Sequence, residues 1–290
     1  MSEFSITEAA YAGFRITRER PKALAVWALV CLIEVALVLV VMGPLFDAVQ
    51  ALSPQDMSDQ VKLAHVIDAY SPRLGLMIPI NLIASALFHA AMNRAVFHPN
   101  EDRFGYLRLG VDELKQLGLQ VALAGISVLA KLAGQLLGAL GGGSPGAMAI
   151  GAIATLALWV VIATRLSLAS PMIMETGRID MVGAWRLTHG RLGALLRTYL
   201  VISGLCAAVF LLALVVVSAV TALAGTAADG LRAATPLAAP LMAFFDHGHP
   251  GYMVSTSIGL GLTLALISPI WLTPAAVIYL RLTRSGGVVA

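Results

Sequence analysis

The sequence has few charged residues and few cysteines, and each scarcity narrows what the protein can be. Of its 290 residues, 12% are charged and 59% are hydrophobic, whereas a soluble domain averages about 25% charged and about 45–50% apolar residues. So few charged residues cannot form the polar surface that a soluble protein needs around its apolar core. A disordered chain is excluded as well, because disorder requires low hydrophobicity and high net charge. Two cysteines exclude a disulfide scaffold and a multi-cysteine metal cluster. An integral membrane protein remains.

Six long apolar runs are present, and each can cross a hydrocarbon core of about 30 Å as a helix. None alternates as barrel strands do, and a backbone in lipid must satisfy its own hydrogen bonds. We therefore predict an all-α polytopic membrane protein with six transmembrane helices. The predicted spans are 23–42, 74–92, 117–140, 147–163, 200–223 and 253–280.

Lys and Arg residues are divided unequally between the two sides of these spans. With the N-terminus inside, fifteen fall in or beside the inner segments and three fall in the outer loops. Because positively charged loops stay on the cytoplasmic side, we expect both termini in the cytoplasm and the protein in a bacterial inner membrane. The net charge of +3 then reflects topology, and we expect no nucleic-acid partner.

The chain repeats an order of residues. Residues 13–29 align with 184–200 at a shift of 171 positions, and a weaker third copy places Arg108 opposite Arg15. The matched residues of the first two copies include Phe14 with Trp185, Arg15 with Arg186 and Thr17 with Thr188. Any helix that leaves the cytoplasm tends to carry aromatic and basic residues, but the preserved order favours a true repeat.

We therefore predict three hairpins within one membrane domain, 1–290, with repeat units near 5–94, 103–165 and 180–284. Each unit would contain a cytoplasmic lead segment, an outgoing span, an outer loop and a returning span. The lead segments are amphipathic, so we expect interfacial helices whose partners are membrane lipids, anionic lipids among them. The expected lipid contacts are Arg15, Arg108, Trp185 and Arg186.

Residues 165–196, RLSLASPMIMETGRIDMVGAWRLTHGRLGALL, carry a family resemblance. A helix ends in Arg, Ser-Pro follows, an apolar run leads to Glu175, and a spacer precedes Ala-Trp-Arg-Leu-Thr-x-Gly-Arg. This order resembles bacterial six-span proteins grouped with the membrane domain of glycerophosphoryl diester phosphodiesterases. In those relatives a separate soluble domain carries the chemistry. Here ten residues follow the last predicted span, so the resemblance implies a membrane domain without that activity.

Motifs for catalysis and metal binding are missing or weak. The sequence contains no G-x-S-x-G elbow and no H-E-x-x-H motif. His89 lies in the second predicted span, but nothing marks a serine as the nucleophile of an intramembrane protease. The best metal candidates are Asp246, His247 and His249, whose spacing fits no common zinc signature. We therefore expect no enzyme, no cofactor and no metal site.

One acid and one base lie well inside predicted spans. Glu34 is in the first span and Lys131 in the third, at depths that differ by roughly 5–6 Å, and the long lysine side chain can close that gap. Because an unpaired charge in the membrane is costly, we predict that the two share an interior site. This site would either fix helix register or serve a proton or a substrate. The expected lining residues are Gln120, Ser127 and Gln135, and Asn81 is the alternative partner of a protonated Glu34.

Small residues recur every four positions in several spans, which lets another helix approach closely. They are Ala130, Gly134 and Gly138 in the third span, Ala147, Gly151 and Thr155 in the fourth, and Ser257 and Gly261 in the sixth.

Together these features favour a non-enzymatic inner-membrane protein that interacts with lipid or holds envelope components together, with an envelope protein as a further partner. The alternative is a transporter or permease for a small or lipid-like solute, working through the Glu34/Lys131 site.

Overall fold

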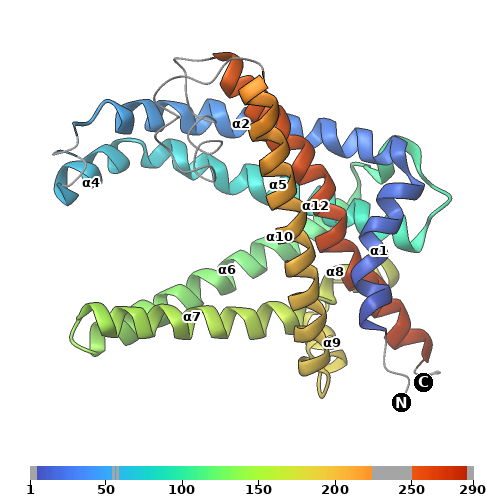
Figure 1. Ribbon diagram of the computed structural model, residues 1–290. Coiled ribbons are helices and arrows are strands. Elements are labelled where there is room, and N and C mark those ends of the chain that lie inside the picture. Colours follow the sequence, from blue (N-terminus) through green and yellow to red (C-terminus); the bar gives the residue numbers. More distant parts are fainter. Residues whose placement is uncertain (1–4, 54–55, 57–58, 224–249, 286–290) are drawn as a thin grey trace. The chain divides into compact units, whose positions relative to one another are not determined.

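The computed structural model describes residues 5–53, 56, 59–223 and 250–285 (Figure 1). Every regular element in those ranges is a helix, which confirms the all-α prediction. The long helices are α2 (Pro21–Gln50), α5 (Ser71–Phe97), α6 (Val111–Leu140), α7 (Pro145–Leu166), α10 (Leu192–Leu223) and α12 (Pro250–Ser285). The short ones are α1 (Ile6–Glu19), α4 (Gln60–Ala69), the 3₁₀ helix η1 (Arg103–Tyr106), α8 (Ala169–Thr176) and α9 (Met181–Leu187).

Each of the six predicted spans falls inside one of the long helices. Six segments in the described part of the chain are long and apolar enough to cross a membrane. Their outward-facing side chains are largely apolar, as expected for helices solvated by lipid. The architecture is that of a multi-pass helical membrane protein.

The chain divides into two compact units. Helices α5, α10 and α12 contribute a part to each unit, and neither unit coincides with a predicted repeat. Unit 1 is Met1–Glu19, Ser85–Gly204 and Pro269–Ala290, and unit 2 is Arg20–Ala84 and Leu205–Ser268.

Within unit 2, glycines of α12 set the helix packing. A Cβ added to Gly261 would lie 2.7 Å from Cδ2 of Leu32 on α2, and one added to Gly259 would overlap Val217 on α10. The close approach predicted at Gly261 is therefore present.

The segment between α2 and α5 is organised by two aspartates. Asp59 caps α4 by accepting hydrogen bonds from the backbone N–H groups of Val61 and Lys62. The Lys62 ammonium and the Ser53 hydroxyl donate hydrogen bonds to Asp56, which hold the pKa of that carboxyl below its usual range. Asp56 is therefore ionised at neutral pH.

Within unit 1, the short helix α8 forms the centre of the core. Residues 169–173 of this helix are all buried, because α8 is covered by parts of α1, α6, α9, α10 and α12. Gly177 then ends α8 with a φ of 65°, a left-handed conformation that favours glycine. The core cluster comprises Ala9, Leu119, Leu168, Ala169, Met172, Ile173, Ala184, Leu195, Ile278 and Tyr279.

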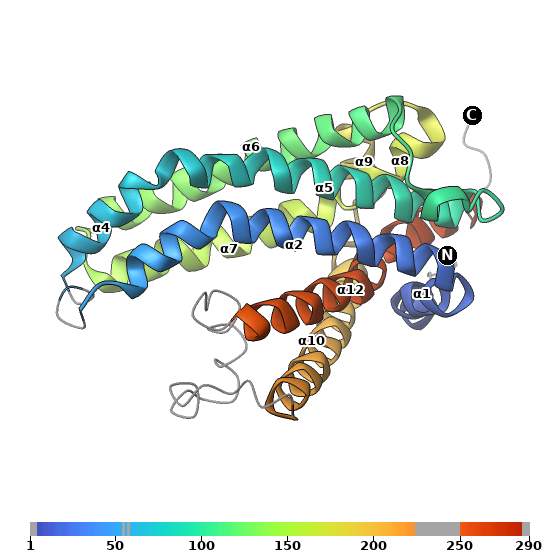
Figure 2. The same cartoon turned by 90° about the horizontal axis from the view of Figure 1, so that it is seen from above.

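Helices α6 and α7 form a hairpin (Figures 1 and 2), and small residues lie at their contact. A Cβ added to Gly134 would lie 2.6 Å from the carbonyl oxygen of Gly151. The Thr155 hydroxyl lies 3.3 Å from the carbonyl oxygen of Ala130 and donates to that of Gly151 at 2.9 Å. The close helix approach that these small residues predicted is therefore present, and the approaching helices are α6 and α7 themselves.

The lead segments take different forms. Ser5 caps α1 by accepting a hydrogen bond from the backbone N–H of Glu8, and Asp180 caps α9 by accepting one from the backbone N–H of Gly183. The weaker copy has only the short 3₁₀ helix η1 before α6, which begins at Val111 and continues into the span.

The matched threonines of the two stronger copies make the same contact. The hydroxyl of Thr17 donates to the carbonyl of Gly13, and the hydroxyl of Thr188 donates to that of Ala184. Gly13 and Ala184 are themselves matched at the shift of 171 positions. Other helical hydroxyls, such as those of Thr198 and Thr263, make the same bond four residues back, so the repeat stays a prediction.

Candidate functional site

A buried hydrogen-bond network in unit 1 is centred on Ser170 of α8. Asn93 of α5 donates its Nδ2 hydrogen to the Ser170 hydroxyl at 2.8 Å. Gln116 of α6 holds Ser170 twice: its Nε2 donates to the Ser170 carbonyl at 2.9 Å, and its Oε1 accepts from the hydroxyl at 3.0 Å. The Nδ1 atom of His89 lies 3.2 Å from the same hydroxyl. Asn93, Gln116 and Ser170 are at most 4% exposed.

The proton positions in this network follow from the capacity of each group. A serine hydroxyl has one hydrogen to donate. Because Gln116 Nε2 must face the Ser170 carbonyl, Gln116 Oε1 faces the hydroxyl and takes that hydrogen. His89 must then donate from Nδ1, which leaves Nε2 as the acceptor nitrogen of its ring.

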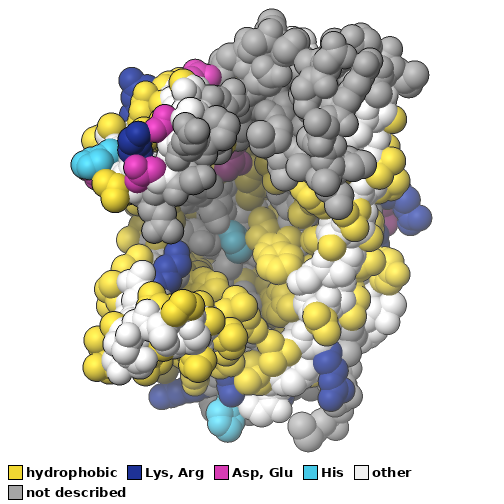
Figure 3. All heavy atoms as spheres, turned by 60° about the vertical axis from the view of Figure 1, so that its left-hand side comes forward, with side chains coloured by type: hydrophobic (Ala, Val, Ile, Leu, Met, Phe, Trp, Pro, Cys, Tyr) yellow, Lys and Arg dark blue, Asp and Glu magenta, His cyan; other side chains and the backbone are white. Residues whose placement is uncertain are grey.

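A cavity of about 630 Å³ in unit 1 adjoins this network. We call it the histidine cavity. Figure 3 shows hydrophobic side chains over most of the described surface on one face, with few charged side chains among them. The apolar lining includes Leu119, Leu123, Trp159, Leu196, Trp271 and Leu272, and the polar lining includes His89, Gln120, Thr164, Ser167, Ser170 and Tyr199.

The lining of the histidine cavity includes no charged residue. One of its polar groups is unsatisfied, since the Nε2 atom of Gln120 is buried without a hydrogen-bond partner in the described structure. Tyr199 and Trp271 pack there with ring centroids 6.3 Å apart. The cavity thus offers apolar walls, an acceptor nitrogen in His89 and, buried in its wall, the unpartnered amide nitrogen of Gln120.

A second cavity of about 500 Å³ lies farther along α6 and α7, also within unit 1. We call it the lysine cavity, because Lys131 lines it together with Ser127, Gln135 and Thr155. Trp159 lines both cavities, so the two are adjacent. A polar stripe along α6 therefore faces these two cavities, and it comprises Gln120, Ser127, Lys131 and Gln135.

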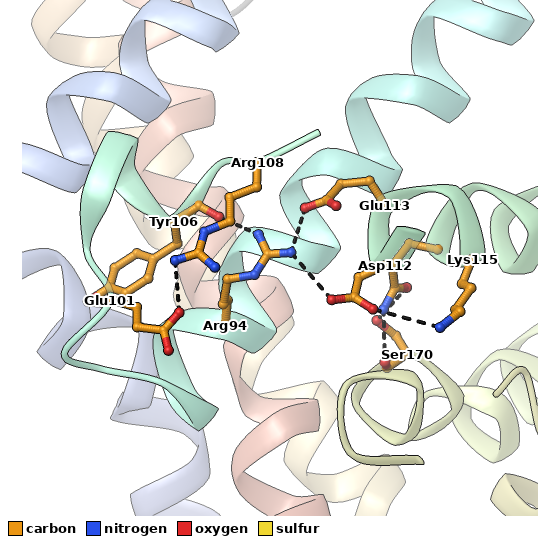
Figure 4. A network of polar contacts seen from close by, with 9 residues as sticks. Arg94, Glu101, Tyr106, Arg108, Asp112, Glu113, Lys115 and Ser170 are labelled. Carbon is orange, nitrogen blue, oxygen red and sulfur yellow. Dashed lines mark hydrogen bonds and ion pairs between the residues drawn. The ribbon is translucent and has the colours of Figure 1, made fainter. Parts of the chain in front are cut away.

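Arg94 organises the segment between α5 and α6 (Figure 4). Its guanidinium donates to the Tyr106 carbonyl and to Glu113 Oε1, both at 2.6 Å, and lies 3.8 Å from Asp112. The side chains of Arg94 and Glu113 are 4% and 8% exposed. Close by, Arg108 forms a half-exposed ion pair with Glu101 at 2.8 Å, so the predicted lipid contact at Arg108 shares its charge with a carboxylate.

The arginine that ends each predicted returning span contacts the lead segment of another repeat unit, all within unit 1. Arg94 of the first unit pairs with Glu113 of the second. Arg165 of the second unit lies over the Trp185 ring of the third, 5.4 Å from its centroid. Arg281 of the third unit pairs with Glu8 of the first. The three contacts follow a cyclic order among the predicted repeat units, and the repeat itself stays a prediction.

The other expected lipid contacts lie at the surface of unit 1. Arg15 on α1 and Arg186 on α9 are exposed, and Trp185 is 41% exposed beside Arg165. Two large apolar side chains nearby in the sequence are more exposed still, Phe104 at 81% and Leu109 at 91%. Exposed basic and apolar side chains thus both occur on these segments of unit 1, as they do on proteins that sit at a membrane interface.

The structure does not test the predicted pairing of Glu34 with Lys131. Glu34 and Asn81 belong to unit 2, where Asn81 donates a hydrogen bond to the Met77 carbonyl of its own helix. Lys131 and Gln135 belong to unit 1. The metal candidates Asp246, His247 and His249 lie outside the described residues.

Sequence reasoning missed the Ser170 network and the Arg94–Glu113 pair. Ser170 looked like part of a turn before Pro171, and Arg94 looked like a signal of topology alone. The sequence did contain one usable signal. Asn93, Gln116 and Glu113 are polar residues at the edges of apolar runs, and polar side chains at the ends of several helices can come together there. Comparison of the chain with known protein families, curated proteins and solved structures found no match, and the family resemblance stays a prediction.

Proposed function

We propose that the protein is a non-enzymatic, multi-pass protein of the bacterial inner membrane that binds a lipid-like amphiphile in the histidine cavity. The observation that carries this proposal is the lining of that cavity. Apolar side chains make most of its surface, and the hydrogen-bonding groups that remain are uncharged. Sites for small molecules commonly combine an apolar wall with a few fixed polar groups.

The unsatisfied groups define what the ligand must provide. Gln120 Nε2 needs an acceptor, because a buried amide hydrogen without a partner costs about 1–3 kcal/mol. His89 Nε2 can accept a hydrogen bond from a ligand hydroxyl. A long apolar body that carries a hydroxyl or an ester group meets both needs.

The surface of unit 1 supports placement in a membrane with both termini in the cytoplasm. Arg15, Arg108 and Arg186 lie on segments that the charge distribution assigns to the cytoplasmic side. Exposed aromatic and aliphatic side chains beside them suit the headgroup region, and the arginines suit anionic lipid. An envelope protein that docks on this surface is the second partner in the proposal.

The Ser170–His89 contact is a structural one in this proposal. A nucleophilic serine would have to donate its hydrogen to the histidine. Here Gln116 takes that hydrogen, and Ser170 is 4% exposed. The network fixes the histidine ring at the cavity wall.

Quenching of tryptophan fluorescence tests the proposal. Variants of the full chain that retain only Trp159 or only Trp271 are reconstituted in phosphatidylcholine nanodiscs and titrated with a long-chain alcohol brominated on its chain. We expect saturable quenching in both, and non-saturable quenching in a variant that retains only Trp185. Ala163→Phe, which fills the cavity, should abolish saturation, and Ala157→Phe on the exposed side of α7 should not. Linear quenching in all variants would contradict lipid binding.

Transport of a lipid-like solute is the second candidate function. The observation that favours it is the polar stripe of α6, since Gln120, Ser127 and Lys131 face two adjacent cavities that follow the length of the span. A flux assay in proteoliposomes separates the two functions. Solute movement that disappears in Lys131→Gln would establish transport, and binding without movement would restrict the protein to the first role.

A further inference from the structure

We infer that the lysine cavity binds the anionic group of an amphiphile, a carboxylate or a phosphate, whose apolar chain extends into the histidine cavity. This inference rests on the proposed function, and it adds the charge of the ligand. It starts from the position of Lys131. The residue lies nine positions before Leu140, the last residue of α6, which is about 14 Å along the helix axis.

At that depth a lysine needs a partner. Charged side chains inside a membrane face a cavity or the protein interior, and they pair with an opposite charge. The salt bridges in the described part of unit 1 involve Arg94, Arg108, Lys115 and Arg281, and none involves Lys131. Lys131 is exposed, and its ammonium group therefore lines an open cavity without a carboxylate partner among the described residues of its own unit.

The surroundings of Lys131 suit an anion. Gln135, one turn farther along α6, offers an amide that can donate to the same group, and the lining of the lysine cavity contains no acidic residue. The hydroxyl hydrogens of Ser127 and Thr155 are used within the α6–α7 hairpin. The donors that remain are thus Lys131, Gln135 and the indole N–H of Trp159.

The geometry of the hairpin indicates an amphiphile. Gly134 and Gly151 hold α6 and α7 in backbone contact at the lysine cavity, so this cavity has a fixed floor. Trp159 lines both the lysine cavity and the histidine cavity, and most of the walls of the histidine cavity are apolar. A ligand that fills both needs one charged end and a chain.

Three probes with the same brominated chain test the inference, one ending in a carboxylate, one in a phosphate and one in an alcohol. They are titrated into the full chain with Trp159 as its only tryptophan, in phosphatidylcholine nanodiscs. We expect the two anionic probes to bind about tenfold more tightly than the alcohol, since hydrogen bonds to charged groups are the stronger ones. Lys131→Gln should remove this preference, Lys131→Arg should keep it, and Lys115→Gln at the start of α6 is the matched control.

Several results would overturn the inference. Equal affinity for all three probes, with no change in Lys131→Gln, would leave lipid binding intact and exclude the anion site. Displacement of the anionic probes by inorganic phosphate would assign the cavity to a free anion. A preference that appears only in Glu34→Gln would show that Glu34 already neutralises Lys131. If no probe quenches Trp159 saturably, the proposed function itself fails. Binding of the alcohol to Lys131→Gln shows that the variant is folded.

Discussion

Arg94 donates a 2.6 Å hydrogen bond to Glu113, and both side chains are almost fully removed from the surface. The pair joins the end of α5 to the start of α6 in unit 1. A second hydrogen bond from Arg94 to the Tyr106 carbonyl fixes the connecting segment. In that segment Phe104, Gly105 and Tyr106 all have positive φ angles, so the ion pair holds a backbone that is costly for the two aromatic residues.

Loss of one partner should therefore destabilise the protein strongly. Arg94→Met leaves the Glu113 carboxylate buried without its cation, and we expect the free energy of unfolding in detergent to fall by about 3–5 kcal/mol. Arg108→Met is the matched control, because the Arg108–Glu101 pair is half exposed and should contribute about 0–1 kcal/mol. The double variant Arg94→Met/Glu113→Leu should lose less than Arg94→Met alone. Equal losses for Arg94→Met and Arg108→Met would refute the role of burial.

Ser170→Ala should be destabilising, and wild-type Ser170 should be chemically inert. The substitution leaves Asn93 Nδ2 and Gln116 Oε1 without a partner, which should cost about 1–3 kcal/mol. Ser127→Ala, whose hydroxyl bonds only to its own helix, should stay within about 0.5 kcal/mol of wild type. A fluorophosphonate probe should not label the protein. Labelling that vanishes in Ser170→Ala would instead identify an enzyme.

Gly134→Ala should weaken the α6–α7 hairpin. The added methyl group meets the Gly151 carbonyl, and we expect a loss of about 1–3 kcal/mol in the free energy of unfolding. Gly125→Ala on the same helix is the control, because nothing lies within 4 Å of its added Cβ. The Gly134 variant should also lose the anion preference of the lysine cavity. If Gly134→Ala and Gly125→Ala had similar stability, the close contact between α6 and α7 at Gly134 would not contribute to the stability of the hairpin.

Thiol labelling tests the topology. In a chain with Cys31 and Cys206 replaced by alanine, Asp59→Cys should react with an impermeant maleimide added outside cells, and Glu101→Cys should react only after the membrane is opened. Both sites are in loops or caps between long helices. The opposite pattern would place most of the basic residues on the outer side.

The arginines of the lead segments should attract anionic lipid. Removal of Arg15 and Arg186 together should weaken binding to vesicles that contain phosphatidylglycerol, by about 1 kcal/mol for each charge. The side chains are exposed on α1 and α9, so the fold should persist. If the double variant prefers vesicles with anionic lipid as strongly as the wild type does, these arginines have a role in topology alone.

The six spans could be predicted from the sequence because span length and apolar composition are local properties. The polar stripe of α6 was predictable for the same reason, since helical periodicity places Gln120, Ser127 and Lys131 on one side. What the stripe faces was not predictable, because the cavities are made by residues of other helices. Helix caps at Ser5 and Asp180 followed from their nearest neighbours in the chain.

The Ser170 network could not be predicted because its members are distant in sequence. Asn93 is 77 positions from Ser170, and Gln116 is 54 positions from it. Each residue alone is unremarkable at the edge of an apolar run, and only packing of α5, α6 and α8 brings them together. The Glu34–Lys131 pairing was predicted from depth and charge in the sequence. Its two members fall in separate units, so the structure does not test it.

The contact of α1 with α12 has a consequence for how the protein is made. Glu8 and Arg281 are 273 positions apart, and Gly13 rests on the backbone of Pro269 and Ile270. At a synthesis rate of about 5–20 residues per second, tens of seconds separate the appearance of α1 from that of its partner. During this interval α1 lacks the helix on which it packs. Because α1 is amphipathic, it can bind at the membrane interface until α12 is made. Insertion of the last helix is then the event that completes the core of unit 1.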